Sequence, residues 1–312
     1  MAALFVFALF SALVDVFAAQ RLQHLDPGSV AAVAFTLTGA FFCGLTLLRT
    51  RPARVLAVAR AHAADLLVLN VTTAVTWLSL LYALKLMEPA VANVVSIAIG
   101  PACTVLLQYL WWRKDRVLPG ELLAALGIVL ALAGLVWASL DGRSGVGDRG
   151  AAVMALGVCA AVASGAGGAA NVVFSARLGA AGVDVPTVMG LRFGLVAAAG
   201  WLLAGTGDTA RLGAALLPGA VVAVIGVGIP AVLVQIGVRR VTPVTASMIC
   251  ALAPALTLLL QLADKRLTFS VPSALGITVI TVLIGLGLLA RRGAPPAAAA
   301  QEGKKIHALP GS

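Results

Sequence analysis

Ten long apolar stretches follow one another along this chain, and they constrain its fold more than any other feature. The stretches lack the dyad alternation of barrel strands, and backbone in contact with lipid is satisfied only in helices or closed barrels. An apolar helix needs about 20 residues to cross a bilayer. We therefore predict an all-α membrane protein with ten transmembrane helices. They are expected over residues 2–19, 30–48, 65–84, 90–111, 120–140, 150–175, 185–204, 216–238, 244–263 and 271–290.

Composition and charge agree with a chain that lies in lipid. Of the 312 residues, 61% are hydrophobic and 11% are charged, and the mean hydropathy is +1.05. The net charge of +10 could suggest nucleic acid, but the basic residues lie in short connections and at the C-terminal end. We therefore expect the bilayer as partner and no nucleic acid. The four cysteines stand alone in apolar runs, so we expect neither a disulfide framework nor a metal site, and no cofactor.

The basic residues also predict the orientation of the helices. If the N-terminus is inside, the inside connections and the tail carry fourteen Lys and Arg residues against seven outside. The positive-inside rule then places both termini in the cytoplasm, with the chain in the cytoplasmic (inner) membrane. The first stretch lacks a basic n-region and a small-residue cleavage site, so we interpret it as a retained helix. Residues 291–312 are expected to be a disordered cytoplasmic tail.

Matching residues occur in the same order in the two halves of the chain, at an offset near 155. This order predicts a duplication, with repeats at residues 1–141 and 142–290. Five helices per repeat is an odd number, so the second repeat would enter the membrane upside down, as in many secondary transporters. The matched pairs are Asp15 with Asn171, Arg21 with Arg177, Asp26 with Asp184, Phe35 with Phe193, Lys85 with Arg239, Pro89 with Pro243, Pro101 with Pro254, Gln108 with Gln261, Asp115 with Asp264 and Gly127 with Gly276.

These halves resemble the EamA branch of the drug/metabolite transporter (DMT) superfamily. The resemblance rests on the five-helix repeats and on the fourth-helix pattern Ala90-Val91-Ala92-Asn93, Pro101, Gln108 with its copy Val244-Thr245-Ala246-Ser247, Pro254, Gln261. It implies ten helices, cytoplasmic termini, a central cavity lined mainly by helices one to four and six to nine, and movement of small metabolites without ATP. The sequence departs from the family pattern at Ala34, where the second half has Arg192, and at Asp15, where a neutral polar residue is common. These departures leave the substrate class open.

Asp15 is an acidic residue well inside an apolar stretch. An intramembrane carboxylate costs about 2.5–3.5 kcal/mol even on the most lenient scale, so it should face protein or water. It could carry a proton or bind a cationic group, or it could only fix helix packing. Arg192 could extend its side chain to the surface, form a structural pair, or bind an anion.

Other isolated polar or amphipathic groups are candidates for a cavity lining, although hydrogen bonding between helices explains each of them as well. They are Asn70, Trp77, Tyr82, Asn93, Asn171, Gln235 and Ser247. Pro101 and Pro254 each remove a backbone donor and are expected to act as hinges in helices four and nine. Gly226, Gly228 and Pro230 predict a further weak point in helix eight.

No enzyme signature is present, so we expect no catalytic residues. The sequence favours a secondary transporter of a small organic solute, working by alternating access and driven by a proton or solute gradient. A divalent-cation permease on the same scaffold would need clustered carboxylates, and a non-transporting membrane accessory protein is a further alternative. The chain could also form a homodimer.

Overall fold

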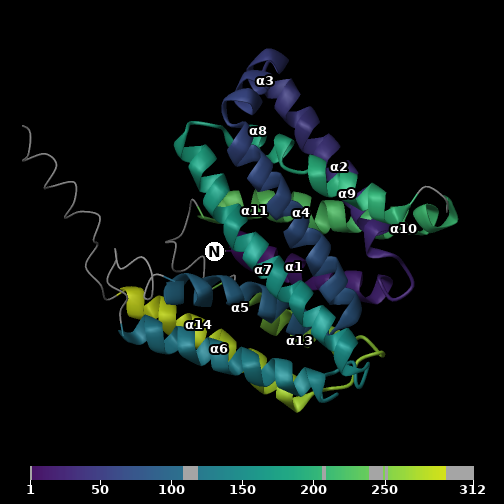
Figure 1. Ribbon diagram of the computed structural model, residues 1–312, viewed down its shortest axis with the longest axis vertical. Coiled ribbons are helices and arrows are strands. Elements are labelled where there is room, and N and C mark those ends of the chain that lie inside the picture. Colours follow the sequence, from purple (N-terminus) through teal and green to yellow (C-terminus); the bar gives the residue numbers. More distant parts are fainter. Residues whose placement is uncertain (1, 108–118, 206–208, 239–248, 250–251, 293–312) are drawn as a thin grey trace, which may run out of the picture.

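Helices account for the architecture of the chain. The computed structural model describes residues 2–107, 119–205, 209–238, 249 and 252–292 (Figure 1). Over these residues the chain contains no strand, so the prediction of an all-α fold is confirmed there. The helices are α1 (Ala2–Arg21), α2 (Pro27–Arg49), α3 (Pro52–Ala61), α4 (Ala63–Leu86), α5 (Pro89–Leu107), α6 (Pro119–Leu140), α7 (Ala151–Ala180), α8 (Val185–Leu191), α9 (Gly194–Ala204), α10 (Thr209–Val221), the π-helical segment η2 (Val222–Gly228), α11 (Ile229–Val238), α13 (Ala253–Gln261) and α14 (Val271–Arg292).

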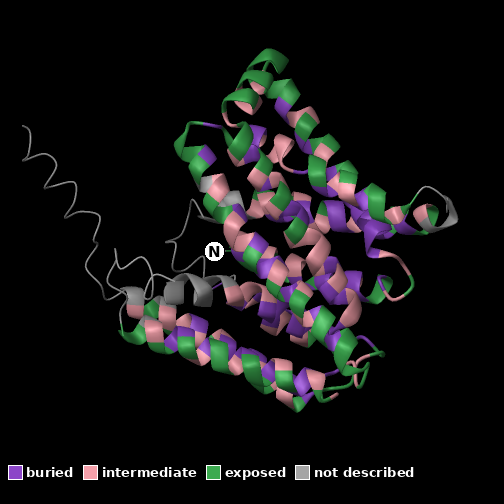
Figure 2. Cartoon of the chain, viewed as in Figure 1, coloured by how far each residue is buried: buried purple, intermediate pink, exposed green. Residues whose placement is uncertain are grey.

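Seven helical segments in the described part of the chain are long and apolar enough to cross a membrane, and two shorter apolar helices accompany them. Figure 2 shows exposed residues along these helices, and large apolar residues are among them. Leu48, Leu130 and Leu202, for example, are 88%, 73% and 83% exposed. Such a surface suits lipid and not water. The chain is therefore a multi-pass membrane protein, while the count of ten spans stays a prediction.

Four connections gather on one face of the bundle, which we call the inter-half face. Hydrogen bonds join them: Thr268 donates its N–H to the Gly145 carbonyl at 2.9 Å, and Arg149 donates to Gln23 Oε1 at 2.9 Å. Within this face the side-chain and backbone groups of Arg266 bond the Asp264 carboxylate. Burial raises the pKa of that carboxyl, but the hydrogen bonds and charge of Arg266 outweigh burial and hold the pKa below its ordinary value. The connections of this face are residues 22–26, 87–88, 141–150 and 262–270.

The opposite face holds residues 50–62 and 181–184, and we call it the α3 face. An ion pair joins Arg177 to Asp65 at 3.2 Å, and the Thr46 hydroxyl donates to the Pro186 carbonyl at 2.7 Å. Helix α3 itself has no buried residue, and the sequence analysis did not predict it. Since α1 ends and α14 begins at the inter-half face, Ala2 and Arg292 both lie toward the α3 face.

The helices pack in reciprocal pairs. Several contacts between a first-half helix and a second-half helix have counterparts in which the two halves exchange roles. Helix α4 packs on α7, and correspondingly η2 and α11 pack on α1. Likewise, α5 packs on α7 as α13 packs on α1, and α2 packs on α10 as α9 packs on α4. Helices α6 and α14 lie side by side along one edge of the bundle (Figure 1). At this contact, an added Cβ at Gly127 would lie 3.0 Å from Leu283, and one at Gly276 would lie 2.6 Å from Leu135. Each glycine therefore receives a leucine of the other helix.

The second helix of each half begins in the same way. Asp26 accepts the N–H of Ser29 at 3.0 Å before α2, and Asp184 accepts the N–H of Thr187 at 3.3 Å before α8. A carboxylate at this position satisfies an N–H group that the first turn leaves without a partner. The two aspartates matched in the sequence thus have the same local role.

The helix expected over residues 185–204 is interrupted. It divides into α8 and α9 at Arg192 and Phe193, whereas α2, the matching helix of the first half, is continuous. The helix expected over residues 216–238 also departs from α geometry, because η2 separates α10 from α11. This segment contains Gly226 and Gly228, where the sequence predicted a weak point.

Pro101 and Pro254 occupy different positions in their helices. Helix α5 runs through Pro101 without interruption. Pro254, expected near the middle of a span, instead lies in the first turn of α13, where its missing N–H is not needed. Residues 244–248 and 250–251 of that expected span lie outside the described residues, as does most of the predicted disordered tail, residues 293–312. The hinge role of the two prolines stays a prediction.

Candidate functional site

Asp15 and Asn93, two of the candidates chosen from the sequence, contact each other inside the bundle. Asp15 comes from α1 and Asn93 from the first turns of α5, and each is 5% exposed. Asn93 Nδ2 donates a hydrogen bond to Asp15 Oδ2. In the part of the chain that the structure describes, Asp15 forms no ion pair, and Asn93 Oδ1 is buried without a hydrogen-bond donor. The carboxylate therefore lies in the apolar interior with an amide and, among the described residues, no neutralising cation.

Asn171, the repeat partner of Asp15, has a different environment. Thr72 and Thr73 of α4 donate to Asn171 Oδ1 at 3.3 and 3.0 Å, and Asn171 Nδ2 donates to Thr76 at 3.2 Å. These bonds use Oδ1 and one of the two Nδ2 protons of the amide, and they attach α7 to α4. For Asn171, the hydrogen bonding between helices that the sequence offered as the alternative is what the structure contains.

Asn70 bridges the interruption between α8 and α9. Its Nδ2 donates to the Leu191 carbonyl at 2.8 Å and to the Leu66 carbonyl at 2.9 Å, and its Oδ1 accepts the Leu195 N–H at 3.2 Å. A helix end buried in the membrane leaves backbone groups that water cannot satisfy. An amide side chain can satisfy both ends of the break because it donates and accepts. Asn70 of α4 thus stabilises the break.

Arg192 lies at that break. Its guanidinium lies 5.4 Å from the centroid of the Phe193 ring, and Nη1 donates to Met189 Sδ at 3.7 Å. Its Nε is buried without a hydrogen-bond acceptor among the described residues, and no ion pair to an acid is present there. Arg192 therefore does not pair with Asp15.

An aromatic cluster packs beside Arg192. Phe35 and Phe193 stack with centroids 6.0 Å apart, Phe42 stacks on Phe193 at 6.1 Å, and Trp77 of α4 tilts against Phe35 at 5.3 Å. The cluster joins α2, α4 and the start of α9. Arg192 lies over one ring of the cluster, that of Phe193, and ring faces attract cations and apolar groups.

The remaining candidates are less informative. Tyr82 is half-buried on α4. The backbone of Gln235 belongs to α11, but its side chain, like that of Pro101, lies outside the description, and Ser247 lies wholly outside it.

Glu88 is a residue that the sequence analysis missed. It lies between α4 and α5, is 0% exposed, and accepts three hydrogen bonds, from the Gly145 N–H at 2.7 Å, Ser273 Oγ at 2.7 Å and Gln261 Nε2 at 2.5 Å. In the sequence it falls between two apolar stretches, where charged residues are common. Its position directly before Pro89 at a helix start was the available signal.

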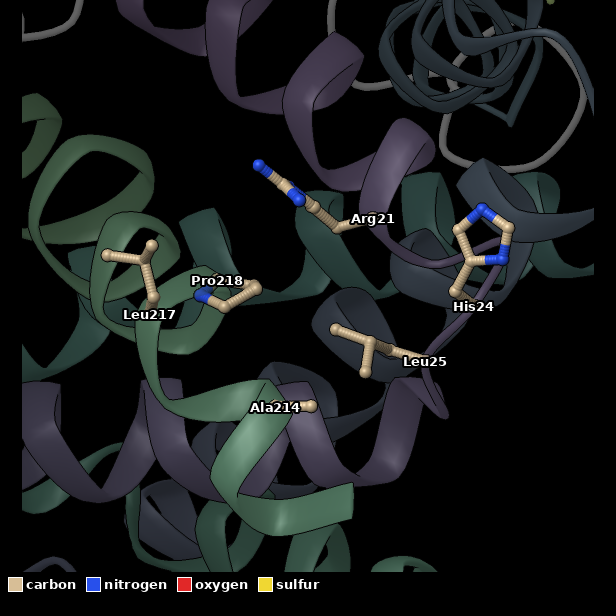
Figure 3. Close-up of a pocket in the computed structure, with 6 residues that line it drawn as sticks. All are labelled: Arg21, His24, Leu25, Ala214, Leu217 and Pro218. Atoms are coloured by element: carbon tan, nitrogen blue, oxygen red, sulfur yellow. The ribbon is translucent and has the colours of Figure 1, made fainter. Parts of the chain in front are cut away.

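A surface depression on the inter-half face is separate from these groups (Figure 3). Its lining combines two basic side chains with apolar ones from α10 and the end of the first connection. The six residues are Arg21, His24, Leu25, Ala214, Leu217 and Pro218. None of the candidates from the sequence lines it, so we place the functional site at Asp15, Asn93 and the aromatic cluster instead.

With these groups in place, comparison with known proteins identifies the first half. Residues 1–140 match the model of the EamA-like transporter family. This half is an EamA-like module. The resemblance found in the sequence is thereby confirmed over these residues, and the matched family is one of transporters.

A solved structure extends the likeness beyond the EamA-like module. It is described only as the crystal structure of a protein, and it covers 95% of this chain and 99% of its own, with 23% identity and a TM-score of 0.60. At that identity the likeness concerns the fold alone. No curated protein matches the sequence.

Proposed function

We propose that this chain is a secondary transporter that moves a small organic solute across the cytoplasmic membrane by alternating access. The moving parts are two inverted five-helix halves, residues 1–141 and 142–290, and a proton gradient drives the movement through Asp15. The observation that carries the proposal is the buried Asp15 carboxylate, which has an amide partner and no cation among the described residues.

The inverted repeat is supported by contacts between matched residues. Phe35 stacks on its sequence partner Phe193, and Gly127 and Gly276 each receive a leucine from the other half. A residue that touches its own repeat partner lies near a two-fold axis. Inverted repeats of this kind can exchange conformations, which opens one face as the other closes.

Asp15 suits a coupling role because of its energetics. A charged carboxylate in an apolar interior is costly, and binding a proton removes that cost. The Asn93 amide provides one hydrogen bond to the carboxylate, while its own oxygen is left for a further donor. Arrival of a proton or of a donor group on the solute would therefore change the energy of this part of the bundle.

The solute side of the proposed site is the aromatic cluster with Arg192. Ring faces offer contact to apolar or cationic parts of a solute, and the Arg192 Nε offers an unused donor. We propose that small organic solutes with an apolar body are carried there. Both termini are proposed to lie in the cytoplasm, with the α3 face inside.

The test is solute counterflow in proteoliposomes made with the full chain. Vesicles loaded with one member of each class of small organic solute are diluted into a trace of the same radioactive solute, with and without an inward or outward pH gradient. We expect uptake above that of protein-free vesicles for at least one class, and a change in its rate with the gradient. Absence of counterflow for every class would favour the non-transporting accessory role.

A further inference from the structure

Glu88 joins the two halves of the transporter at the inter-half face. It belongs to the first half, while its three donors, Gly145, Gln261 and Ser273, all come from the second. The donors lie in the α6–α7 connection, at the end of α13 and at the start of α14. One buried carboxylate thus holds three segments against the start of α5.

The cluster is built to hold a carboxylate. Gln261 is oriented by a further bond, because its Oε1 accepts the Ala90 N–H at 3.1 Å, and this leaves Nε2 to donate to Glu88. The Gly145 N–H can only donate. A Cβ at residue 145 would lie 2.8 Å from the Thr268 carbonyl and 3.1 Å from Glu88 Cδ, so only glycine permits this approach. Three donors directed at one carboxyl group satisfy its acceptor oxygens in the interior.

Among the residues that the structure describes, no cation contacts the Glu88 carboxylate. Its stability in a buried position therefore depends on the three hydrogen bonds, and all three are lost or weakened if the two halves separate here. Because all three bonds end on one carboxylate, they favour the same closed arrangement of the two halves.

We propose that Glu88 is the positioning residue that keeps the inter-half face of the transporter closed, and that its bond to Gln261 breaks when this face opens. The proposal rests on the alternating-access function proposed above. Opening a path between α5 and α13 at this face requires the Glu88 carboxylate to leave Gln261, because that bond links the start of one helix to the end of the other. Glu88 touches no solute in this scheme and acts through the balance between the two states.

The test measures both faces at once by spin-label distances in the full chain, reconstituted in lipid nanodiscs with the native cysteines replaced by serine. One labelled pair is His24→Cys with Lys265→Cys on the inter-half face, and the other is Leu48→Cys with Ala180→Cys on the α3 face. All four positions are exposed. The variants are Glu88→Ala and the isosteric Glu88→Gln. The control is Ser139→Ala, which removes a buried hydroxyl that bonds only its own helix at Leu135.

We expect Glu88→Ala to add a longer distance on the inter-half face and a shorter one on the α3 face, with the ratio of the two states shifted roughly tenfold to hundredfold, the range for loss of a charged hydrogen-bond acceptor. Glu88→Gln should shift the ratio of the two states less, in the same direction, because one N–H of its amide would face a hydrogen-bond donor. Ser139→Ala should leave this ratio unchanged. Longer distances on the inter-half face without change on the α3 face would mean local loosening and would overturn the proposal, as would no change on either face. These distances are independent of counterflow, so a working carrier with unmoved distances removes the Glu88 role alone.

Discussion

Phe35 of α2 and Phe193 at the start of α9 stack on one another with an interplanar angle of 22°. Each lies at the same distance along the chain from its capping aspartate, Asp26 or Asp184, so the rings are repeat partners as well as neighbours. Under the inverted repeat proposed above, their contact places the crossing of α2 with α8 and α9 near the pseudo-two-fold axis. This crossing is where a movement of one half relative to the other has its smallest displacement.

Replacement of either ring should therefore have similar effects on stability. We expect Phe35→Ala and Phe193→Ala each to lower the free energy of unfolding by about 3–5 kcal/mol, because both rings are fully buried. Unfolding in mixed micelles with increasing SDS measures this. Phe41→Ala is the matched control, since Phe41 is 61% exposed and should lose little. Equal losses for all three variants would contradict a central role of the stacked pair.

Residues after α3 and after α6 should lie on opposite sides of the membrane. Arg60 lies on the α3 face and Arg149 on the inter-half face. Reporter fusions that are active only in the cytoplasm should be active after Arg60 and inactive after Arg149. A reporter that gives the same activity at both positions would disprove this topology.

Transport by the Asp15→Asn variant should lose its dependence on a proton gradient. The amide keeps an acceptor for Asn93 Nδ2 but carries no titratable group. Counterflow without a gradient should persist, while gradient-driven accumulation should fall to the level of equilibration across a pH series at equal membrane abundance. Thr38→Val is a suitable control, because Thr38 is buried and bonds only the carbonyl of Ala34 in its own helix. Unchanged rate and pH dependence in Asp15→Asn would make this carboxylate structural.

Asn70→Ala should destabilise the bundle at the interruption between α8 and α9. The substitution leaves the Leu191 carbonyl and the Leu195 N–H without their partner, at about 1–3 kcal/mol for each group left unpaired inside the membrane. Asn70→Asp should lie between wild type and Asn70→Ala, because it keeps the acceptor for Leu195 and loses the donor to Leu191. The same SDS unfolding measures the order of the three proteins, and a stability of Asn70→Ala equal to wild type would exclude the bridging role.

The sequence predicted much of this fold because lipid restricts the choices. Apolar length alone identifies α1, α2, α4 and α6, and the cost of a buried charge correctly predicted that Asp15 faces the interior. The sequence could not identify Asn93 as the partner of Asp15, since a contact between α1 and α5 depends on how the helices pack. The break at Arg192 was missed as well. Gly190 and Gly194 flank it, but the group that makes it possible, Asn70, is on another helix.

Glu88 shows the opposite case, in which local sequence misled. A carboxylate between two apolar stretches is ordinarily solvated, and its position before Pro89 at a helix start does not by itself indicate burial. Its three donors come from distant segments, and they turn a connection into the interior of an interface. Burial of such a group becomes visible only when the second half is in place.

In the described chain, two helices are irregular, the broken α8–α9 helix and the helix that contains the π-helical η2. Both belong to the second half. Their counterparts in the first half, α2 and α4, run without interruption. Two identical halves would give inward-open and outward-open forms of equal energy, populated one to one when no gradient is present. A chain with its irregularities on one side cannot have that equality. The proposed carrier would therefore favour one of these two forms in the absence of a gradient, and its sequence would determine which one. After a duplication, substitutions in the second half alone could have produced this preference.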